Sequence, residues 1–174
     1  MKTINNYISE KLQISSKGKQ YNYFPKTKEE LREIIEQRIQ EEGDECDLND
    51  IDVSEITDMS HLFFESGFNG DISEWDVSKV ENMEGMFYKS NFNQDISKWN
   101  VSNVETMNGM FVNSNFNGNI SEWDVSKVED MANMFYKSKF NQDISSWDVS
   151  NVKYMGGIFE DSPLEGKEEE WWNK

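Results

Sequence analysis

The chain has 174 residues, and 34 acidic against 17 basic side chains give it a formal net charge of −17. Leu, Ile, Val and Phe together make up about 22% of the residues, close to the roughly 20% below which a highly charged chain stays disordered. The sequence contains no apolar stretch near the roughly 18 residues that a membrane span needs, and its acidity argues against direct binding of nucleic acid.

The leading segment, residues 1–26, is basic and only weakly apolar. Residues 1–28 hold six lysines and one glutamate, whereas residues 29–174 hold 11 basic and 33 acidic side chains. The start has neither the continuous apolar run nor the small-residue cleavage site of a secretory signal, so we expect a cytoplasmic protein. Its apolar residues suit either an edge strand or a short helix: Tyr7, Ile8, Leu12 and Ile14.

A helix is predicted from Lys28 to Glu42. Thr27 and Glu30 have the spacing of a capping box, and Gly43 suits the position after the last turn. One apolar stripe runs along the predicted helix: Leu31, Ile34, Ile35 and Ile39. We expect this stripe to cover the exposed end of the repeats that follow.

The single cysteine and the single histidine argue against catalysis and metal binding. Cys46 has no second cysteine with which to form a disulfide and is expected to be a small, buried or half-buried residue. His61 has no cysteine or histidine at ligand spacing, so it is expected to be a surface or capping residue without function. No nucleophile, base and orienting group come together in the sequence. We therefore expect no catalytic residue, no metal and no cofactor.

Internal repetition is the strongest feature of the sequence. Tryptophan recurs every 24 residues, at Trp75, Trp99, Trp123 and Trp147. Alignment on this residue gives five units, numbered one to five: 51–74, 75–98, 99–122, 123–146 and 147–170. Units two and four differ at only 5 of 24 positions. The chain therefore divides into an N-terminal segment with a capping helix (1–50), five repeats (51–170) and a short tail (171–174).

The apolar columns of the repeats predict the fold. The segment 72–77, with Trp75 and Val77, is short and partly alternating, which is typical of a strand. Val80, Met83 and Met86 follow at the i, i+3 spacing of a helical turn. One parallel strand and one helical turn in each 24-residue unit predict an α/β, leucine-rich-repeat-like solenoid with a continuous core. One asparagine column is expected to form an internal ladder that satisfies backbone groups: Asn69, Asn93, Asn117 and Asn141.

The repeat pattern W-[DN]-V-S-x-V-x-x-M-x-x-M-F-x-x-S-x-F-N-x-[DN]-I-S-x resembles that of BspA-like bacterial surface proteins. It is most similar to the subgroup with repeats of about 25 residues that was first grouped as a mycoplasma-type domain of unknown function. WDVS, MF and FNQDIS stand in this sequence as such, and the resemblance covers residues 51–164. It implies adhesion or protein binding without catalytic residues, and surface display as an alternative to a cytoplasmic location.

The candidate binding surface is an acidic, exposed strand face. Alternation about Trp75 and Val77 sends the residue between them away from the core, together with its equivalents in the other units. We predict a monomeric, non-catalytic module that binds a protein partner with a basic surface. The candidate residues are the side chains of this face and two tyrosines that lie outside the core columns and are expected to be exposed: Asp52, Glu74, Asp76, Asn100, Glu122, Asp124, Asp148, Tyr88 and Tyr136. Two alternatives stay open, inhibition of a nucleic-acid-binding protein by charge mimicry and a role as a bacterial surface adhesin or antigen.

Overall fold

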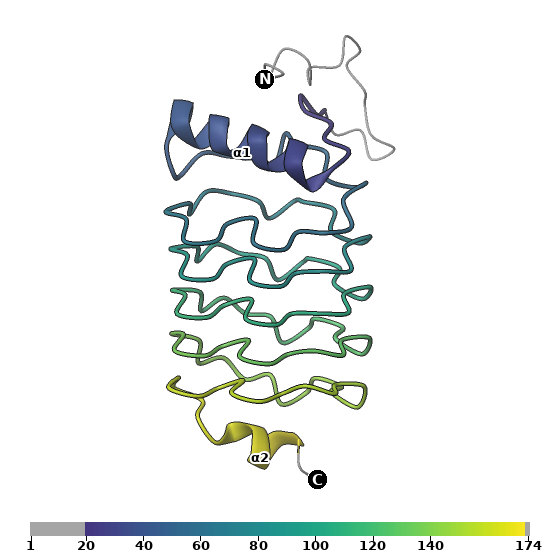
Figure 1. Ribbon diagram of the computed structural model, residues 1–174, viewed down its shortest axis with the longest axis vertical. Helices are drawn as coiled ribbons and strands as arrows, with labels where there is room; N and C mark the ends of the chain where they lie inside the picture. The colour runs from purple at the N-terminus through teal and green to yellow at the C-terminus, as the bar shows by residue number, and fades with distance from the viewer. Residues whose placement is uncertain (1–19, 173–174) are drawn as a thin grey trace.

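The computed structural model of the chain describes residues 20–172 (Figure 1). Two helices form in this range, α1 (Lys28–Glu42) and α2 (Lys167–Trp172). The remainder is coil and turns, in which backbone pairing is limited to isolated parallel bridges: Tyr23↔Ile51, Asp58↔Asn82, Asn82↔Thr106, Thr106↔Asp130 and Asp130↔Tyr154. The strand or helix considered for the leading segment lies outside the described residues: Tyr7, Ile8, Leu12 and Ile14.

Helix α1 has the predicted bounds. The Thr27 hydroxyl accepts a hydrogen bond from the Glu30 backbone N–H at 3.2 Å, as in a capping box. The Glu30 carboxylate accepts from the N–H of Lys26 at 2.8 Å, one residue before the usual partner. Gly43 ends the helix with φ +91°, and its N–H donates to the Ile39 carbonyl at 2.9 Å.

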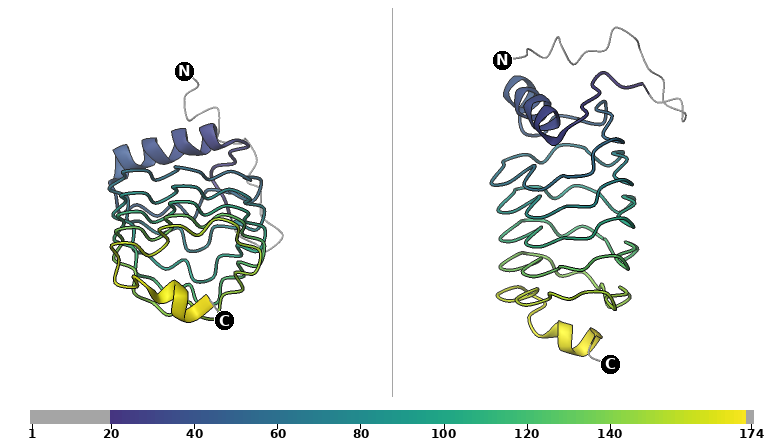
Figure 2. Two further views of the ribbon diagram at one scale, coloured as in Figure 1. Left: turned by 60° about the horizontal axis from the view of Figure 1, so that its bottom comes forward. Right: turned by 45° about the vertical axis from the view of Figure 1, so that its right-hand side comes forward.

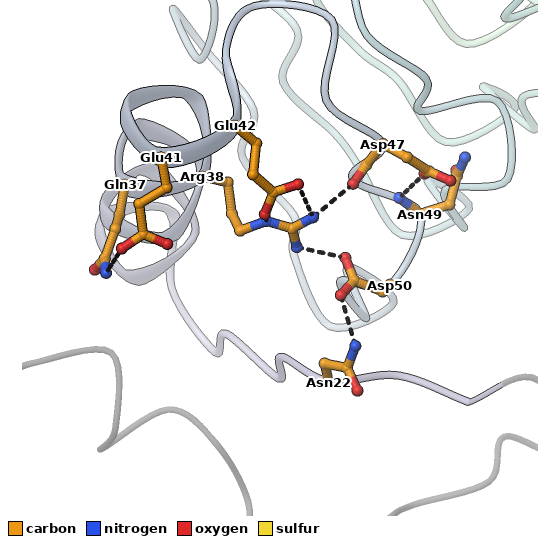
Figure 3. Close-up of polar contacts among 8 residues, drawn as sticks. All are labelled: Asn22, Gln37, Arg38, Glu41, Glu42, Asp47, Asn49 and Asp50. Carbon is orange, nitrogen blue, oxygen red and sulfur yellow. Dashed lines mark hydrogen bonds and ion pairs between the residues drawn. The ribbon is translucent and has the colours of Figure 1, made fainter.

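The inner face of α1 carries an arginine as well as the predicted apolar residues. Arg38 is buried, whereas Ile39 packs only partly against the core, and the other members of the stripe are buried as expected: Leu31, Ile34 and Ile35. Arg38 Nε donates to Glu42 at 2.6 Å and Nη1 to Asp50 at 2.8 Å (Figure 3). Its Nη2 donates to the Asp47 carbonyl at 2.9 Å. Burial lowers the pKa of Arg38, but the hydrogen bonds with Glu42 and Asp50 outweigh burial and raise it.

Each 24-residue unit forms one irregular loop, and the five loops are stacked along the long axis of the molecule (Figures 1 and 2). Helix α1 lies across the first end of the stack and α2 at the other end. Alternate backbone N–H groups of one unit donate to carbonyls of the next, at 2.9–3.0 Å between units two and three: Met83 to Thr106, Gly85 to Asn108 and Phe87 to Met110. The indole N–H of Trp99 donates to the Ile72 carbonyl at 3.1 Å. Neighbouring units are therefore joined by backbone and tryptophan hydrogen bonds.

The predicted α/β, leucine-rich-repeat-like solenoid is wrong, because residues 20–172 contain no sheet, and the only helix of this range that reaches into the repeats is α2 at the end of unit five. The segment 72–77, expected to be a strand, forms turns, in which the Trp75 N–H donates to the Ile72 carbonyl at 3.2 Å. The segment 80–87, expected to be helical, also forms turns. Gly85 there has φ +56°, which a right-handed helix does not allow. Alternate N–H groups of this segment bond to the next unit, so the helical ladder cannot form.

The predicted core columns are confirmed by burial. One phenylalanine per unit lies in a ring stack, in which Phe87 and Phe111 have centroids 5.5 Å apart and planes within 6°. The tryptophan column is likewise buried. Unit five ends the core, since three apolar residues are only partly buried there: Val149, Val152 and Met155. Trp171 and Trp172 of α2 pack against Phe159 beside them.

The asparagine column forms a ladder, but on the surface instead of inside. The Asn69 side chain accepts from the N–H of Asn93 at 2.9 Å, and the Asn93 side chain accepts from Asn117 at 2.8 Å. Every member of the column is exposed or half-buried. The buried polar column is serine, whose hydroxyls accept from the N–H of a phenylalanine two residues later at 2.9–3.3 Å: Ser90, Ser114 and Ser138.

Candidate functional site

The predicted acidic side chains at the second position of each unit form one row, called the acidic column: Asp52, Asp76, Asn100, Asp124 and Asp148. Asp52 is half-buried and the other four are exposed. They lie on turns and not on strands, because each side-chain oxygen accepts from the backbone N–H two residues later. The distance is 3.1 Å from Ser126 to Asp124 and 3.2 Å from Ser102 to Asn100. An oxygen acceptor is all that this turn requires, so an amide serves equally well in unit three.

Two carboxylates of the acidic column are held in the ionised form. The Ser126 hydroxyl donates to Asp124 at 2.6 Å and, with its backbone N–H, lowers the pKa of that carboxyl. Ser150 lowers the pKa of Asp148 in the same way. For Asp124, the hydrogen bonds outweigh the repulsion from Asp148 of the next unit. Asp124 and Asp148 therefore keep their negative charge well below neutral pH.

Replacing Asp124 with asparagine is expected to change the free energy of unfolding by less than about 0.5 kcal/mol, because the turn keeps its oxygen acceptor. Alanine at the same position should lower it by about 1 kcal/mol, since the Ser126 N–H loses that acceptor. Urea denaturation followed by tryptophan fluorescence measures both changes. Equal losses in the two variants would show that the charge of Asp124, and not its acceptor, stabilises the turn.

Two other predicted acidic residues are also exposed. Glu74 approaches Tyr21 together with Asp52 and Asp76, since burial and then these three carboxylates raise the pKa of that phenol. The structure thus brings three of the predicted residues together at the end of the stack near α1. Glu122 is exposed in the chain just before unit four.

A groove of about 410 Å³ crosses units one to four on a different segment of each loop. Its lining includes one residue from the same position of each unit: His61, Gly85, Gly109 and Asn133. A methyl group added at Gly85 would lie 2.4 Å from the His61 ring, and one added at Gly157 would lie 2.5 Å from the Asn133 side chain. Side chains in this column therefore lie over the following unit. Gly109 has no such cover, because only Val112 comes within 4 Å of its added methyl group.

Three rings and one valine line the groove at another position of the units. Phe64 is 45% exposed and stacks on Tyr88, with centroids 4.6 Å apart and planes within 3°. Unit three has Val112 here, which is buried, and unit four has Tyr136. Tyr88 and Tyr136 are half-buried, so the expectation that both are exposed is wrong. The row of rings is interrupted at unit three.

Charged and amide side chains complete the lining. The Glu84 carboxylate is half-exposed and lies 3.9 Å from His61 Nε2, beyond hydrogen-bond distance. The Asn108 amide donates to Asp130 at 3.1 Å. Beyond His61 and Phe64, a second hollow of about 410 Å³ continues onto α1, where Arg32 donates to the His61 carbonyl at 3.2 Å. The surface therefore combines aromatic faces with a few polar groups, as small-ligand sites do.

Of the predicted site residues, only Tyr88 and Tyr136 line the groove, and the predicted acidic residues lie elsewhere among the described residues. The sequence did not predict that Phe64, Glu84 and the hollow at Gly109 are parts of one groove. His61, assigned there to a surface without function, is exposed at the first end of the groove. The signal for the hollow was present in the alignment of the units, as a glycine and a valine in unit three where unit four has asparagine and tyrosine.

Residues 20–172 show neither a metal site nor a membrane-spanning helix. No group of three or more His, Cys, Asp or Glu side chains in this range is arranged to hold a metal ion. Neither helix of the same range has the length and apolar character needed to cross a membrane. Cys46 is buried, as predicted, and burial raises the pKa of its thiol.

Comparison with known proteins gives one match. No curated protein and no solved structure matches the chain. A family model described as "Mycoplasma protein of unknown function, DUF285" matches residues 30–139 and 112–173, which together include all five units and most of α1. The chain therefore belongs to this family of unknown function.

Proposed function

We propose that the protein is a non-catalytic binding module whose acidic column recognises a basic surface of a protein partner. The observation that carries the proposal is the set of serine hydrogen bonds that hold Asp124 and Asp148 both ordered and ionised. Carboxylates fixed in a row on a folded frame attract a basic partner at long range and impose an orientation on it. The acidity of residues 29–174 adds to the same field.

Three lysines of the repeats form ion pairs with carboxylates outside the acidic column. Lys79 pairs with Glu55 at 2.6 Å, and Lys89 pairs with Glu65 at 2.8 Å. In both pairs the carboxylate belongs to the preceding unit. Lys153 bonds in the same way to Glu129 of the preceding unit at 2.7 Å.

A triple variant tests the acidic column without disturbing the turns: Asp76→Asn, Asp124→Asn and Asp148→Asn. Fluorescence anisotropy with a labelled deca-lysine peptide should show that the affinity of the unmodified protein falls at least tenfold between about 50 mM and 500 mM salt. The triple variant should bind the peptide about tenfold more weakly at low salt, because three row charges are gone while their turn acceptors remain.

The matched control removes three exposed carboxylates outside the column: Glu81→Gln, Glu105→Gln and Glu165→Gln. It has the same net charge as the first variant and should retain most of the affinity. Equal weakening in both variants would mean that total charge, and not the acidic column, attracts the peptide. Displacement of a native partner by duplex DNA would instead favour charge mimicry.

We also propose that the chain is related to BspA-like surface proteins. This attribution depends on the repeat pattern alone. It is compatible with a protein-binding role and implies display on a bacterial surface. Immunodetection of the protein on intact cells of its source, compared with lysed cells, tests that location.

A further inference from the structure

The interruption in the row of rings lies beside Gly109, and both positions line the groove. Unit three has Val112 where units two and four have Tyr88 and Tyr136, and its groove position is Gly109, which is buried and whose added methyl group would meet only Val112. We call the hollow beside these two residues the slot. The units on both sides carry a ring at the position of Val112, whereas the position of Gly109 is Gly85 in unit two and Asn133 in unit four.

The slot has the thickness of one unit. Rings in the phenylalanine column follow one another at 5.5 Å between units two and three and at 5.6 Å between units three and four. The Tyr88 ring is already parallel to that of Phe64. Val112 occupies the layer of unit three with a side chain shorter than a ring. A flat group lying against Val112, between Tyr88 and Tyr136, would continue the row of stacked rings.

The surroundings of the slot favour a cation. Lys89 Nζ lies 5.3 Å from the centroid of the Tyr88 ring, and Lys137 Nζ lies 4.8 Å from that of Tyr136, so both rings already attract positive charge. Each lysine is balanced by a carboxylate of a neighbouring unit. Glu84 adds a half-exposed carboxylate to the lining.

We propose that the slot at Gly109 and Val112, between Tyr88 and Tyr136, binds an arginine side chain of the basic partner. A guanidinium group is flat, always charged, stacks on aromatic faces and pairs with a carboxylate, whereas the lysine ammonium group is compact and cannot form such a layer. Glu84 is the carboxylate available for that pairing. This proposal rests on the proposed function and specifies which residue of the partner is recognised.

The test fills the slot without straining the backbone. Units two and four have tyrosine at the position of Val112, so Val112→Tyr introduces a ring that this position of the repeat already accepts. A second variant, Tyr136→Ala, removes one ring. Gly156→Asn is the control, since a side chain at this position meets no atom within 4 Å.

Affinities for labelled deca-arginine and deca-lysine peptides of equal charge are measured by fluorescence anisotropy. The unmodified protein should prefer deca-arginine about tenfold. Val112→Tyr and Tyr136→Ala should each reduce the preference to less than about twofold, leaving the deca-lysine affinity unchanged, and Gly156→Asn should retain it. The loss of preference in both slot variants is the decisive result, because arginine pairs better than lysine with any carboxylate.

The outcomes separate the two proposals. If neither peptide binds, the acidic column has failed and the proposed function falls. If both peptides bind and the arginine preference survives in both slot variants, the slot proposal falls while the proposed function stands. Nuclear magnetic resonance of the tyrosine rings provides the last comparison. Shifts of Tyr88 and Tyr136 caused by cellopentaose, and not by N-acetylargininamide, would overturn the assignment in favour of a neutral sugar ring.

Discussion

Replacing Phe111 with alanine is expected to lower the free energy of unfolding by about 4 kcal/mol. The ring is fully buried at the middle of the stack, where it lies 5.5 Å from Phe87, 5.6 Å from Phe135 and 4.4 Å from Phe116. Its removal leaves a cavity that faces two neighbouring units. Those units are held by their own backbone hydrogen bonds and cannot close around the cavity without breaking them.

Urea denaturation followed by tryptophan fluorescence measures the effect of this substitution. Tyr154→Ala is the control, because the Tyr154 ring is 63% exposed and its loss should cost less than about 0.5 kcal/mol. Comparable losses from the buried and the exposed ring would contradict the expectation that burial in the phenylalanine stack stabilises the fold. Two separate unfolding transitions in the Phe111→Ala variant would show that the substitution has uncoupled the units on either side of unit three.

Replacing Arg38 with methionine is expected to lower the free energy of unfolding by about 3 kcal/mol. Figure 3 shows the Arg38 guanidinium reaching Glu42, Asp50 and the Asp47 backbone from inside the N-terminal cap. Methionine fills a similar volume but leaves these acceptors without their donor, and the carboxylates without a counter-charge. The guanidinium also lies 5.5 Å from the Tyr23 ring, a contact that would be lost as well.

Thermal unfolding followed by circular dichroism checks this expectation. Arg32→Ala is the control, because Arg32 is also on α1 but its hydrogen bond to the His61 carbonyl lies at the surface. This substitution should lower the free energy of unfolding by less than about 1 kcal/mol. A methionine variant as stable as the unmodified protein would show that the Arg38 network positions the cap without stabilising it.

Helix α1 could be predicted from the sequence because its signals are local. Thr27, Glu30 and Gly43 act within one turn of each helix end, and the apolar stripe repeats with the period of the helix. Arg38 was missed for the opposite reason. It continues the stripe from Leu31 and Ile34, but a charged residue there is read as exposed unless its partners are known. Those partners include Asp50, 12 residues later.

The repeats could be found in the sequence, but their conformation could not. The 24-residue period identifies which residues lie over one another, and the apolar columns identify the core. A partly alternating segment such as 72–77 suits a strand or a pair of turns equally, because the deciding hydrogen bonds are made with other segments. The i, i+3 spacing of Val80, Met83 and Met86 resembles a helix, although Gly85 between them is left-handed.

The candidate site was predicted in part. The outward direction of Asp76, Asp124 and Asp148 follows from their place beside the core columns, and these residues are exposed as expected. Their role in the turns was not foreseen, although Asn100 in unit three indicated that an oxygen acceptor matters more there than a charge. The groove depends on which side chains cover the next unit, a property of the stacked loops that one unit does not reveal.

The stacking of the units also determines how the molecule would respond to force. Within the described repeats, the hydrogen bonds between units join immediate neighbours and run in series along the long axis. Tension applied across the two ends of the stack would load these contacts one after another, so units would detach singly. Each detached unit of 24 residues would release about 80 Å of extended chain. The stack would thus act as a tether that lengthens in equal steps and keeps its remaining units folded.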